Sequence, residues 1–339
     1  MPRLFVILAL ACASCAAPEP PRQLVERSRL AMGSQLRLAA WTSDEAAAAA
    51  AFEQVFREFD RLDALLSVWQ PGSDVIRINE AAGRAPVVVG RDTLTVLEAA
   101  AQASEWTGGK FDITFGALAE IWKFDHDQDN TVPSQQAIAA RLPLVDDRLV
   151  QVDRASGTAF IRTAGTRIHL GGIGKGYAVD RAAALLRERG FRDFLIQSGG
   201  DLYVAGLNHG APWTLGIADP RGTGGQTFAT LQLSDGTFST SGDYERFFIK
   251  DGVRYHHLID PDLGRPATGT RSVTIVADSA MLADVLSTGV FILGPTQGMA
   301  LIEKLPQVEG VIVTAANEVL TSSGLTGRLT IVSPPTDAP

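Results

Sequence analysis

The spacing of apolar positions along the chain predicts amphipathic helices in the first half and a strand-rich second half. Residues 44–66 repeat apolar side chains at helical spacing, and we expect Ser43 to cap this helix. Further helices are predicted over residues 92–107, 134–141, 178–190 and 279–293. Strands are predicted over residues 32–41, around 149 and 160, and over 194–197, 202–204, 213–218, 228–233, 245–250, 253–259 and 271–278. This mixture indicates an α+β chain.

A glycine-rich turn, Gly171-Gly172-Ile173-Gly174-Lys175-Gly176-Tyr177, separates an apolar run ending at Leu170 from the helix predicted to begin at Ala178. Glycines let backbone N–H groups approach a ligand without a Cβ in the way, and the N-terminus of the next helix attracts anions. The turn matches neither the Walker A loop nor the dinucleotide-binding fingerprint, because the residues that complete those motifs are missing. The sequence therefore predicts either an anion site here or a tight strand-to-helix turn without a ligand.

Composition and charge exclude one class of partner. Of the 339 residues, 45% are hydrophobic and 20% are charged, which fits one two-lobed domain or two closely packed domains. The formal net charge of −8 and the lack of a basic stripe argue against a nucleic-acid partner.

The first 22 residues are typical of an export signal followed by a tether. Arg3 precedes an apolar run over residues 4–11 that is too short to span a bilayer permanently. The only two cysteines, Cys12 and Cys15, stand where a bacterial lipoprotein signal places its lipidated cysteine. We therefore expect a periplasmic protein anchored by lipid on Cys12 or Cys15, with plain secretion as the alternative. The folded domain is then expected over residues 23–335.

Two oxygen-bearing side chains, Asp284 and Thr288, stand one helical turn apart on a segment that is otherwise apolar. A carboxylate and a hydroxyl on one face suit a hard cation such as Mg²⁺. The alternative is an ordinary pair on a solvent-exposed stripe. The apolar surroundings favour a ligand role, because an unpaired buried carboxylate is costly.

Adjacent histidines, His256 and His257, stand at the end of a predicted strand. Side chains alternate along a strand, so only one of the two can serve a given pocket. A histidine that titrates near neutral pH is a natural general base, although a strand-end histidine is more commonly a surface residue.

Five motifs in order along the chain resemble those of the ApbE family of flavin transferases. They are Lys110-Phe111-Asp112, Leu170 to Ala178 with Asp180, Ser239-Thr240-Ser241-Gly242, His257-Leu258-Ile259-Asp260-Pro261 and Ala283-Asp284-Val285-Leu286-Ser287-Thr288. The resemblance begins near Met32 and continues to the end of the chain. It implies an α+β fold of mixed and antiparallel sheets with flanking helices, similar to a T-fold, with the flavin site between two lobes.

The resemblance also implies an activity. Members of this family are periplasmic enzymes that bind FAD and Mg²⁺, cleave the FAD pyrophosphate, transfer FMN to a threonine of an acceptor protein and release AMP. The acceptor is expected to be a flavin-dependent membrane redox subunit. Two alternatives stay open, namely a pyrophosphatase that releases FMN and AMP, and a lipoprotein that binds FAD without chemistry.

The resemblance assigns roles to individual positions. It implies His257 as the base that activates the acceptor hydroxyl. It implies Asp284, Thr288 and the backbone carbonyl of Gly174 as metal ligands. The residues implied in flavin binding are Met32, Trp69, Lys110, Phe111, Asp112, Gly171, Lys175, Tyr177, Leu258 and Ser287. One position departs from the family, because His169 stands where an aspartate usually precedes the glycine-rich turn.

Overall fold

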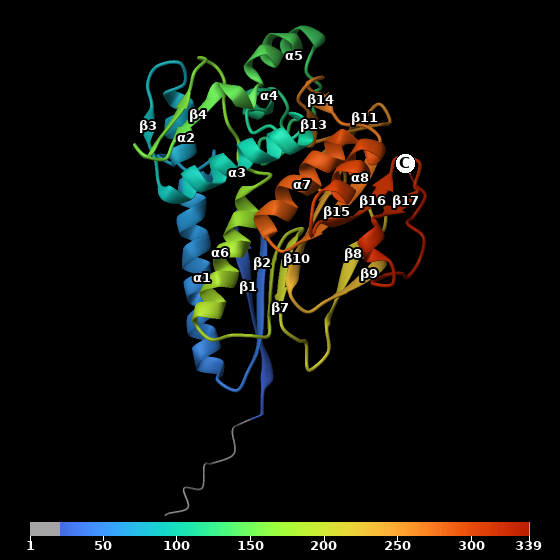
Figure 1. Ribbon diagram of the computed structural model, residues 1–339. Helices are drawn as coiled ribbons and strands as arrows, with labels where there is room; N and C mark the ends of the chain where they lie inside the picture. The colour runs from blue at the N-terminus through green and yellow to red at the C-terminus, as the bar shows by residue number, and fades with distance from the viewer. Residues whose placement is uncertain (1–20, 339) are drawn as a thin grey trace, which may run out of the picture.

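The computed structural model describes residues 21–338 and is built around one eight-stranded antiparallel sheet (Figure 1). Its strand order is β1-β2-β6-β7-β10-β15-β16-β17. The strands are β1 (Gln23–Ala31), β2 (Ser34–Thr42), β6 (Phe194–Ser198), β7 (Asp201–Ala205), β10 (Gly236–Gly242), β15 (Thr270–Ala277), β16 (Glu309–Thr314) and β17 (Val319–Thr321). The predicted signal and the two cysteines lie outside the described residues.

Helices cover one face of this sheet and a small second sheet covers the other (Figure 1). The covering helices are α1 (Glu45–Leu66), α6 (Gly174–Glu188), α7 (Ala280–Leu293) and α8 (Pro295–Lys304). The second sheet has the order β18-β9-β8, with strands β8 (Trp213–Ala218), β9 (Thr227–Leu233) and β18 (Leu329–Ile331), and η3 (Ser323–Leu325) precedes β18. The predicted α+β class with antiparallel sheets and flanking helices is confirmed. Within residues 21–338, no helix is both long enough and apolar enough to cross a membrane.

A third group of elements lies beyond one end of the main sheet, at the top of Figure 1. It comprises α2 (Asp74–Glu80), β3 (Val87–Val88), α3 (Arg91–Thr107), α4 (Gly116–Ala119), α5 (Gln135–Arg141), η1 (Leu142–Leu144), η2 (Asp147–Leu149), β4 (Val150–Asp153) and β5 (Thr158–Ile161). Two hairpins meet this group, formed by β11 (Phe247–Lys250) with β12 (Val253–His256) and by β13 (Ile259–Asp260) with β14 (Arg265–Pro266). Stacked rings of Trp122, Phe124, Phe248 and Tyr255 join the hairpins to the group.

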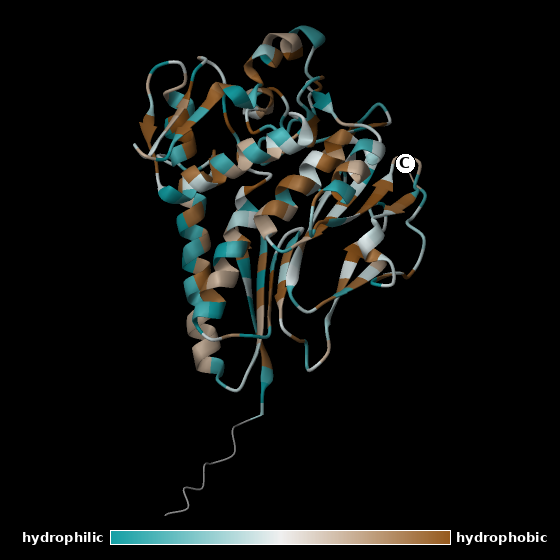
Figure 2. Ribbon diagram, viewed as in Figure 1, coloured by the Kyte–Doolittle hydropathy of each residue, from teal (hydrophilic) through white to brown (hydrophobic). Residues whose placement is uncertain are grey.

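Helix α7 is the most apolar of the long helices, and Figure 2 shows it as hydrophobic along most of its length. It is buried between the main sheet and helices α3, α6 and α8. Ser279 caps its N-terminus as predicted, by accepting the Leu282 N–H at 3.2 Å. Asp180 of α6 accepts the two preceding N–H groups, from Ala280 at 2.7 Å and Met281 at 3.0 Å. The first turn of α7 is therefore fixed to α6.

The start of the folded region differs from the prediction in two respects. Strand β1 was not predicted, because it lies at the sheet edge, where Val25 is its only buried residue and no apolar alternation marks it. Met32 lies in the two-residue turn between β1 and β2, with φ of 47°, and is not part of a strand. Asp44 caps α1 in place of Ser43, by accepting the Ala47 N–H at 2.8 Å.

Two further boundaries differ. Strand β10 was missed because its Ser and Thr residues give no apolar alternation, although its neighbours β7 and β15 bury it on both sides. Helix α6 begins at Gly174 and not at Ala178, so half of the glycine-rich turn is helical. Glycine is a poor helix former, but contacts with α7 hold this first turn in place.

Candidate active site

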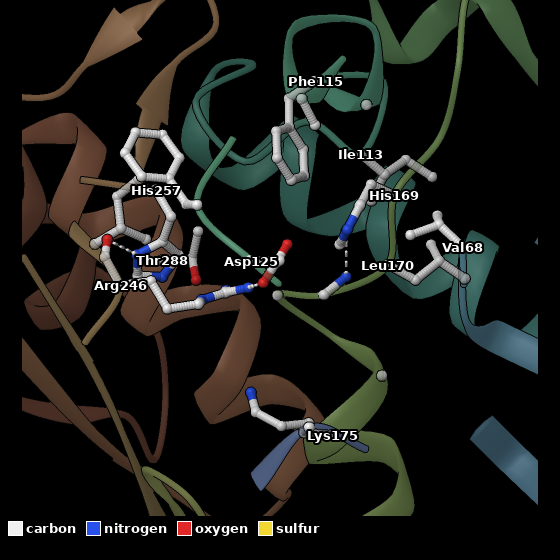
Figure 3. Close-up of a pocket in the computed structure, with 18 of the residues that line it drawn as sticks. Val68, Ile113, Phe115, Asp125, His169, Leu170, Lys175, Arg246, His257 and Thr288 are labelled. Atoms are coloured by element: carbon white, nitrogen blue, oxygen red, sulfur yellow. Dashed lines mark hydrogen bonds and ion pairs between the residues drawn. The ribbon is translucent and has the colours of Figure 1, made fainter. Parts of the chain in front are cut away.

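A cavity of about 1190 Å³ opens where the N-terminus of α6 and the middle of α7 meet the third group of elements. Part of its wall is drawn in Figure 3. Twelve of the fourteen predicted site residues line it: Met32, Trp69, Lys110, Phe111, Asp112, Gly171, Gly174, Lys175, His257, Leu258, Asp284 and Thr288. The structure therefore brings together residues that are up to 256 positions apart in the sequence, from Met32 to Thr288.

The other two predicted residues do not line this cavity. The hydroxyl of Tyr177 donates to Asp92 Oδ1 at 2.5 Å, on the side of α6 that faces α3. The hydroxyl of Ser287 bonds to the Asp284 carbonyl at 2.9 Å and to Ser241 Oγ at 2.8 Å, and the residue is fully buried. Helical rotation turns both side chains away from the cavity, so the structure does not support direct flavin contacts for them.

Helices α6 and α7 approach closely at Gly176. A Cβ on this residue would lie 2.4 Å from the Ala280 carbonyl oxygen, so only glycine fits here. The Gly176 N–H donates to Asp284 Oδ2 at 3.0 Å. It is therefore not available for the carbonyl four residues earlier, which belongs to Gly172, and no described residue donates to that oxygen.

This arrangement points to a different backbone ligand from the one predicted. A Cβ on Gly172 would lie 3.3 Å from Thr288 Oγ1, whereas the nearest atoms to one on Gly174 belong to Met32 and Leu66. Gly174 is also the first residue of α6, so its carbonyl points along the helix. The structure therefore favours Gly172 over Gly174 as the carbonyl beside Asp284 and Thr288.

The charged side chains next to Asp284, Thr288 and the Gly172 carbonyl carry more negative than positive charge. Lys175 Nζ lies 3.0 Å from Asp201 Oδ2, and Asp284 is close enough to interact with both. Burial, followed by the charge of Asp201, raises the pKa of Asp284 to about 7. Burial alone would lower the pKa of Lys175, but Asp201 and Asp284 outweigh it and raise that pKa.

A hard cation fits this donor set. Two carboxylates face one ammonium, and the carboxylate, hydroxyl and free carbonyl that converge are the oxygen donors that Mg²⁺ takes. Among residues 21–338, no group of three or more His, Cys, Asp or Glu side chains could hold a metal. A metal at this site would therefore take fewer than three ligands from such side chains and would need neutral oxygens, such as the Thr288 hydroxyl and the Gly172 carbonyl.

His257 is held as a neutral imidazole. Its ring Nδ1 lies 3.3 Å from the Arg246 carbonyl, and its backbone N–H donates to the same oxygen at 3.1 Å. A carbonyl can only accept, so Nδ1 carries the proton and Nε2 is the free acceptor. Burial and the charge of Arg246 lower the pKa of His257 well below its usual value. His256 is buried outside the cavity, with Nε2 2.9 Å from the Ala267 carbonyl.

His169 replaces the usual aspartate without disrupting the glycine-rich turn. Its Nδ1 accepts the Gly171 N–H at 3.0 Å, which a carboxylate at this position could also do (Figure 3). Burial, followed by the charge of Arg246, lowers its pKa to about 4, so the ring is neutral at neutral pH. The departure therefore removes a negative charge from the cavity and keeps a hydrogen-bond acceptor for the turn.

The predicted flavin-contacting segment around residue 110 is held rigidly. Lys110 Nζ contacts Asp260 Oδ1 and Asp262 Oδ2, each at 2.8 Å, so its charge is already neutralised. Asp112 accepts the backbone N–H of Thr114 at 2.7 Å and that of Asp147 at 3.0 Å, and burial raises its pKa to about 6. These contacts fix the loop that carries the buried ring of Phe111.

Sequence reasoning missed several charged residues that line the cavity, namely Asp125, Asp201, Glu245 and Arg246. Asp201 ends the Ser-Gly-Gly-Asp turn, where Gly200 makes a close backbone approach to Thr240, so a signal for it was present. Asp125 and Arg246 come from distant loops, and no local pattern connects them.

Comparison with known proteins shows which family the chain resembles. The model of the ApbE family matches residues 32–312. A curated FAD:protein FMN transferase from Treponema pallidum (strain Nichols) is 33% identical over 97% of this chain and 96% of its own. One from Klebsiella pneumoniae (strain 342) is 32% identical over 87% of this chain and 91% of its own.

Solved structures show the same fold. The ApbE protein from Thermotoga maritima MSB8 superposes with a TM-score of 0.84 and 32% identity, over 90% of this chain and 99% of that one. The flavin transferase ApbE from Vibrio cholerae superposes with a TM-score of 0.82 and 27% identity, over 91% and 100%. With a family match over most of its length, the chain belongs to the ApbE family.

Proposed function

We propose that this protein is an FAD:protein FMN transferase, which moves FMN from FAD to a threonine of an acceptor protein and releases AMP. The observation that carries the proposal is one cavity in which a neutral histidine and a group of convergent oxygens face the same space. The curated relatives carry this activity in their names and match the chain over most of its length. A cavity of about 1190 Å³ has room for a dinucleotide.

Binding requires the flavin and the pyrophosphate to be placed together. Met32, Trp69 and the segment Lys110 to Asp112 supply the wall on which the flavin would lie. Asp284, Thr288 and the Gly172 carbonyl would hold Mg²⁺, which when bound neutralises phosphate charge and stabilises a developing negative charge. Lys175 stays paired with Asp201 and offsets part of the negative charge that Asp201 and Asp284 carry.

The transfer step needs one proton acceptor from the protein. The threonine oxygen attacks the phosphorus on the FMN side, the P–O bond to AMP breaks, and AMP leaves with the bonding electrons. His257 Nε2 takes the hydroxyl proton, because Nδ1 is committed to the Arg246 carbonyl. The described residues contain no cysteine, and this route requires no protein nucleophile.

The central experiment incubates the purified protein with FAD, Mg²⁺ and a candidate acceptor, followed by mass spectrometry of the acceptor. We expect the acceptor to gain the mass of FMN on a threonine, with AMP as the second product. Release of free FMN and AMP without labelling of any acceptor would identify a pyrophosphatase. Unchanged FAD would identify a binding protein.

A second prediction concerns the metal. Thr288→Val removes one oxygen donor and should weaken Mg²⁺ binding on the order of 10-fold or more, whereas Thr288→Ser keeps the hydroxyl and should retain binding. Because the pKa of Asp284 is about 7, its carboxylate accepts protons in competition with Mg²⁺ as the pH falls. Calorimetric titration should show about 10-fold weaker binding at pH 6 than at pH 8. A Mg²⁺ affinity that is the same in Thr288→Val and Thr288→Ser, and the same at pH 6 and pH 8, would contradict this site.

A third prediction concerns the base. His257→Ala should lower the transfer rate by about 10²- to 10⁴-fold and leave FAD affinity nearly unchanged. In the wild type at saturating Mg²⁺, the lowered pKa of His257 should keep the rate flat down to about pH 6, with a loss only at lower pH. His256→Gln keeps a donor for the Ala267 carbonyl and is the matched control with a near-normal rate. Equal losses in both variants would remove His257 from this role.

A fourth prediction concerns location. We propose an exported, membrane-anchored protein, on the strength of the apolar run beside Cys12 and Cys15, with a flavin-dependent membrane redox subunit as its acceptor. Mass spectrometry of the membrane fraction should find a mature chain that begins at one lipidated cysteine. A cytoplasmic chain that retains Met1 would contradict export.

A further inference from the structure

Four lysine and arginine side chains line the cavity, and the two lysines are already neutralised within the protein. Lys110 contacts two carboxylates, and Lys175 pairs with Asp201, whose side chain is only 2% exposed. Arg167 pairs with Glu120 through its Nε. A guanidinium or ammonium that already has a buried or doubled counter-ion adds little charge for an incoming anion. Arg167 and Arg246 each have a single, partly exposed carboxylate partner, so these two arginines are the cavity cations with charge to offer a ligand.

Arg246 makes one side-chain contact, from Nη1 to Asp125 Oδ1 at 2.6 Å. A guanidinium has five N–H donors, and the other four meet no acceptor in the described part of the chain. The side chains of Arg246 and Asp125 are 40% and 29% exposed, so the pair can separate without burying an unpaired charge. Arg246 therefore has N–H donors free for a ligand, and its position distinguishes it from Arg167.

The position of Arg246 is central. Figure 3 shows its side chain reaching from the region of His257 and Thr288 toward Asp125, with His169 on the far side. Its charge acts on the pKa values of His169, His257, Lys175 and Asp284, which come from three separate segments of the chain. Its backbone carbonyl also holds the His257 ring. A cation at this position faces both the proposed base and the proposed metal ligands.

Resting on the proposed function, we propose that Arg246 is a further catalytic residue, which exchanges Asp125 for the pyrophosphate of FAD when the substrate binds. A guanidinium donates to carboxylate and to phosphate oxygens in the same forked geometry, so one anion can replace the other. In the free protein Asp125 pairs with Arg246, and binding of the substrate breaks this pair. As the bond to AMP breaks, charge accumulates on the phosphate oxygens, and Arg246 stabilises it.

The test compares two ligands that differ in the pyrophosphate. Binding of FAD and of riboflavin, which has no phosphate, is measured by flavin fluorescence at fixed Mg²⁺. Arg246→Gln should weaken FAD binding by about 10- to 100-fold and leave riboflavin binding unchanged. Its single-turnover transfer rate at saturating FAD should fall by about 10²-fold. Arg246→Lys should recover part of both losses.

Arg154→Gln is the control, because it breaks an arginine–carboxylate pair, with Glu98, that lies outside the cavity. It should leave both affinities unchanged. Equal weakening of FAD and riboflavin by Arg246→Gln would show a structural role and overturn the proposal.

The Asp125 variant separates substrate exchange from a permanent bridge. If Asp125 competes with FAD for Arg246, Asp125→Asn should bind FAD more tightly than the wild type. If the pair is instead a bridge that builds the cavity, Asp125→Asn should weaken FAD binding as Arg246→Gln does, and the proposal fails. Asp129→Asn, in the same loop and paired with Lys123 at 3.1 Å, is the control that should leave FAD binding unchanged.

The binding series needs no acceptor protein. If the wild type binds FAD but labels no acceptor, the proposed transferase function fails, while the comparison of FAD with riboflavin still decides the role of Arg246.

Discussion

The close packing of helices α6 and α7 at Gly176 is the constraint on which the candidate site depends. With no side chain at Gly176, its N–H reaches Asp284, and Asp180 on the same helix caps the start of α7. Because the Gly176 N–H donates to Asp284, the Gly172 carbonyl, which lies next to Thr288, has no donor among residues 21–338. A larger residue at position 176 would separate the helices and would disrupt both the carboxylate contact and the group of oxygens.

The site combines buried charge with neutral hydrogen-bonding groups. Asp201 and Asp284 carry more negative charge than Lys175 can balance, so the protein supplies an electrostatic reason for a cation to bind. Two histidines of the cavity wall, His169 and His257, have lowered pKa values and are neutral at neutral pH. His169 accepts a backbone hydrogen bond at Nδ1, whereas His257 donates one from Nδ1 to a backbone carbonyl. This difference gives the two rings different roles.

Much of the site could be predicted because its motifs are local. Ser279 and the apolar sequence of α7 specify a capped, buried helix, and the four-residue spacing puts Asp284 and Thr288 on one face of it. Errors arose where local pattern and packing disagree. Tyr177 and Ser287 lie within recognised motifs, yet helical rotation turns them toward Asp92 and Ser241. The structure favours the Gly172 carbonyl over that of Gly174 beside Asp284 and Thr288, because a carbonyl's direction depends on where the helix begins.

The sequence by itself determined the family, the α+β class, the helix that carries Asp284 and Thr288, and the alternation that separates His256 from His257. These features depend on spacing within a segment, which the order of residues specifies directly. Only the tertiary structure decided the partner of Arg246, the protonated nitrogen of each histidine and the neutralisation of Lys110. These properties depend on atoms from distant segments that meet across a cavity, and their energies depend on burial, which no local pattern specifies.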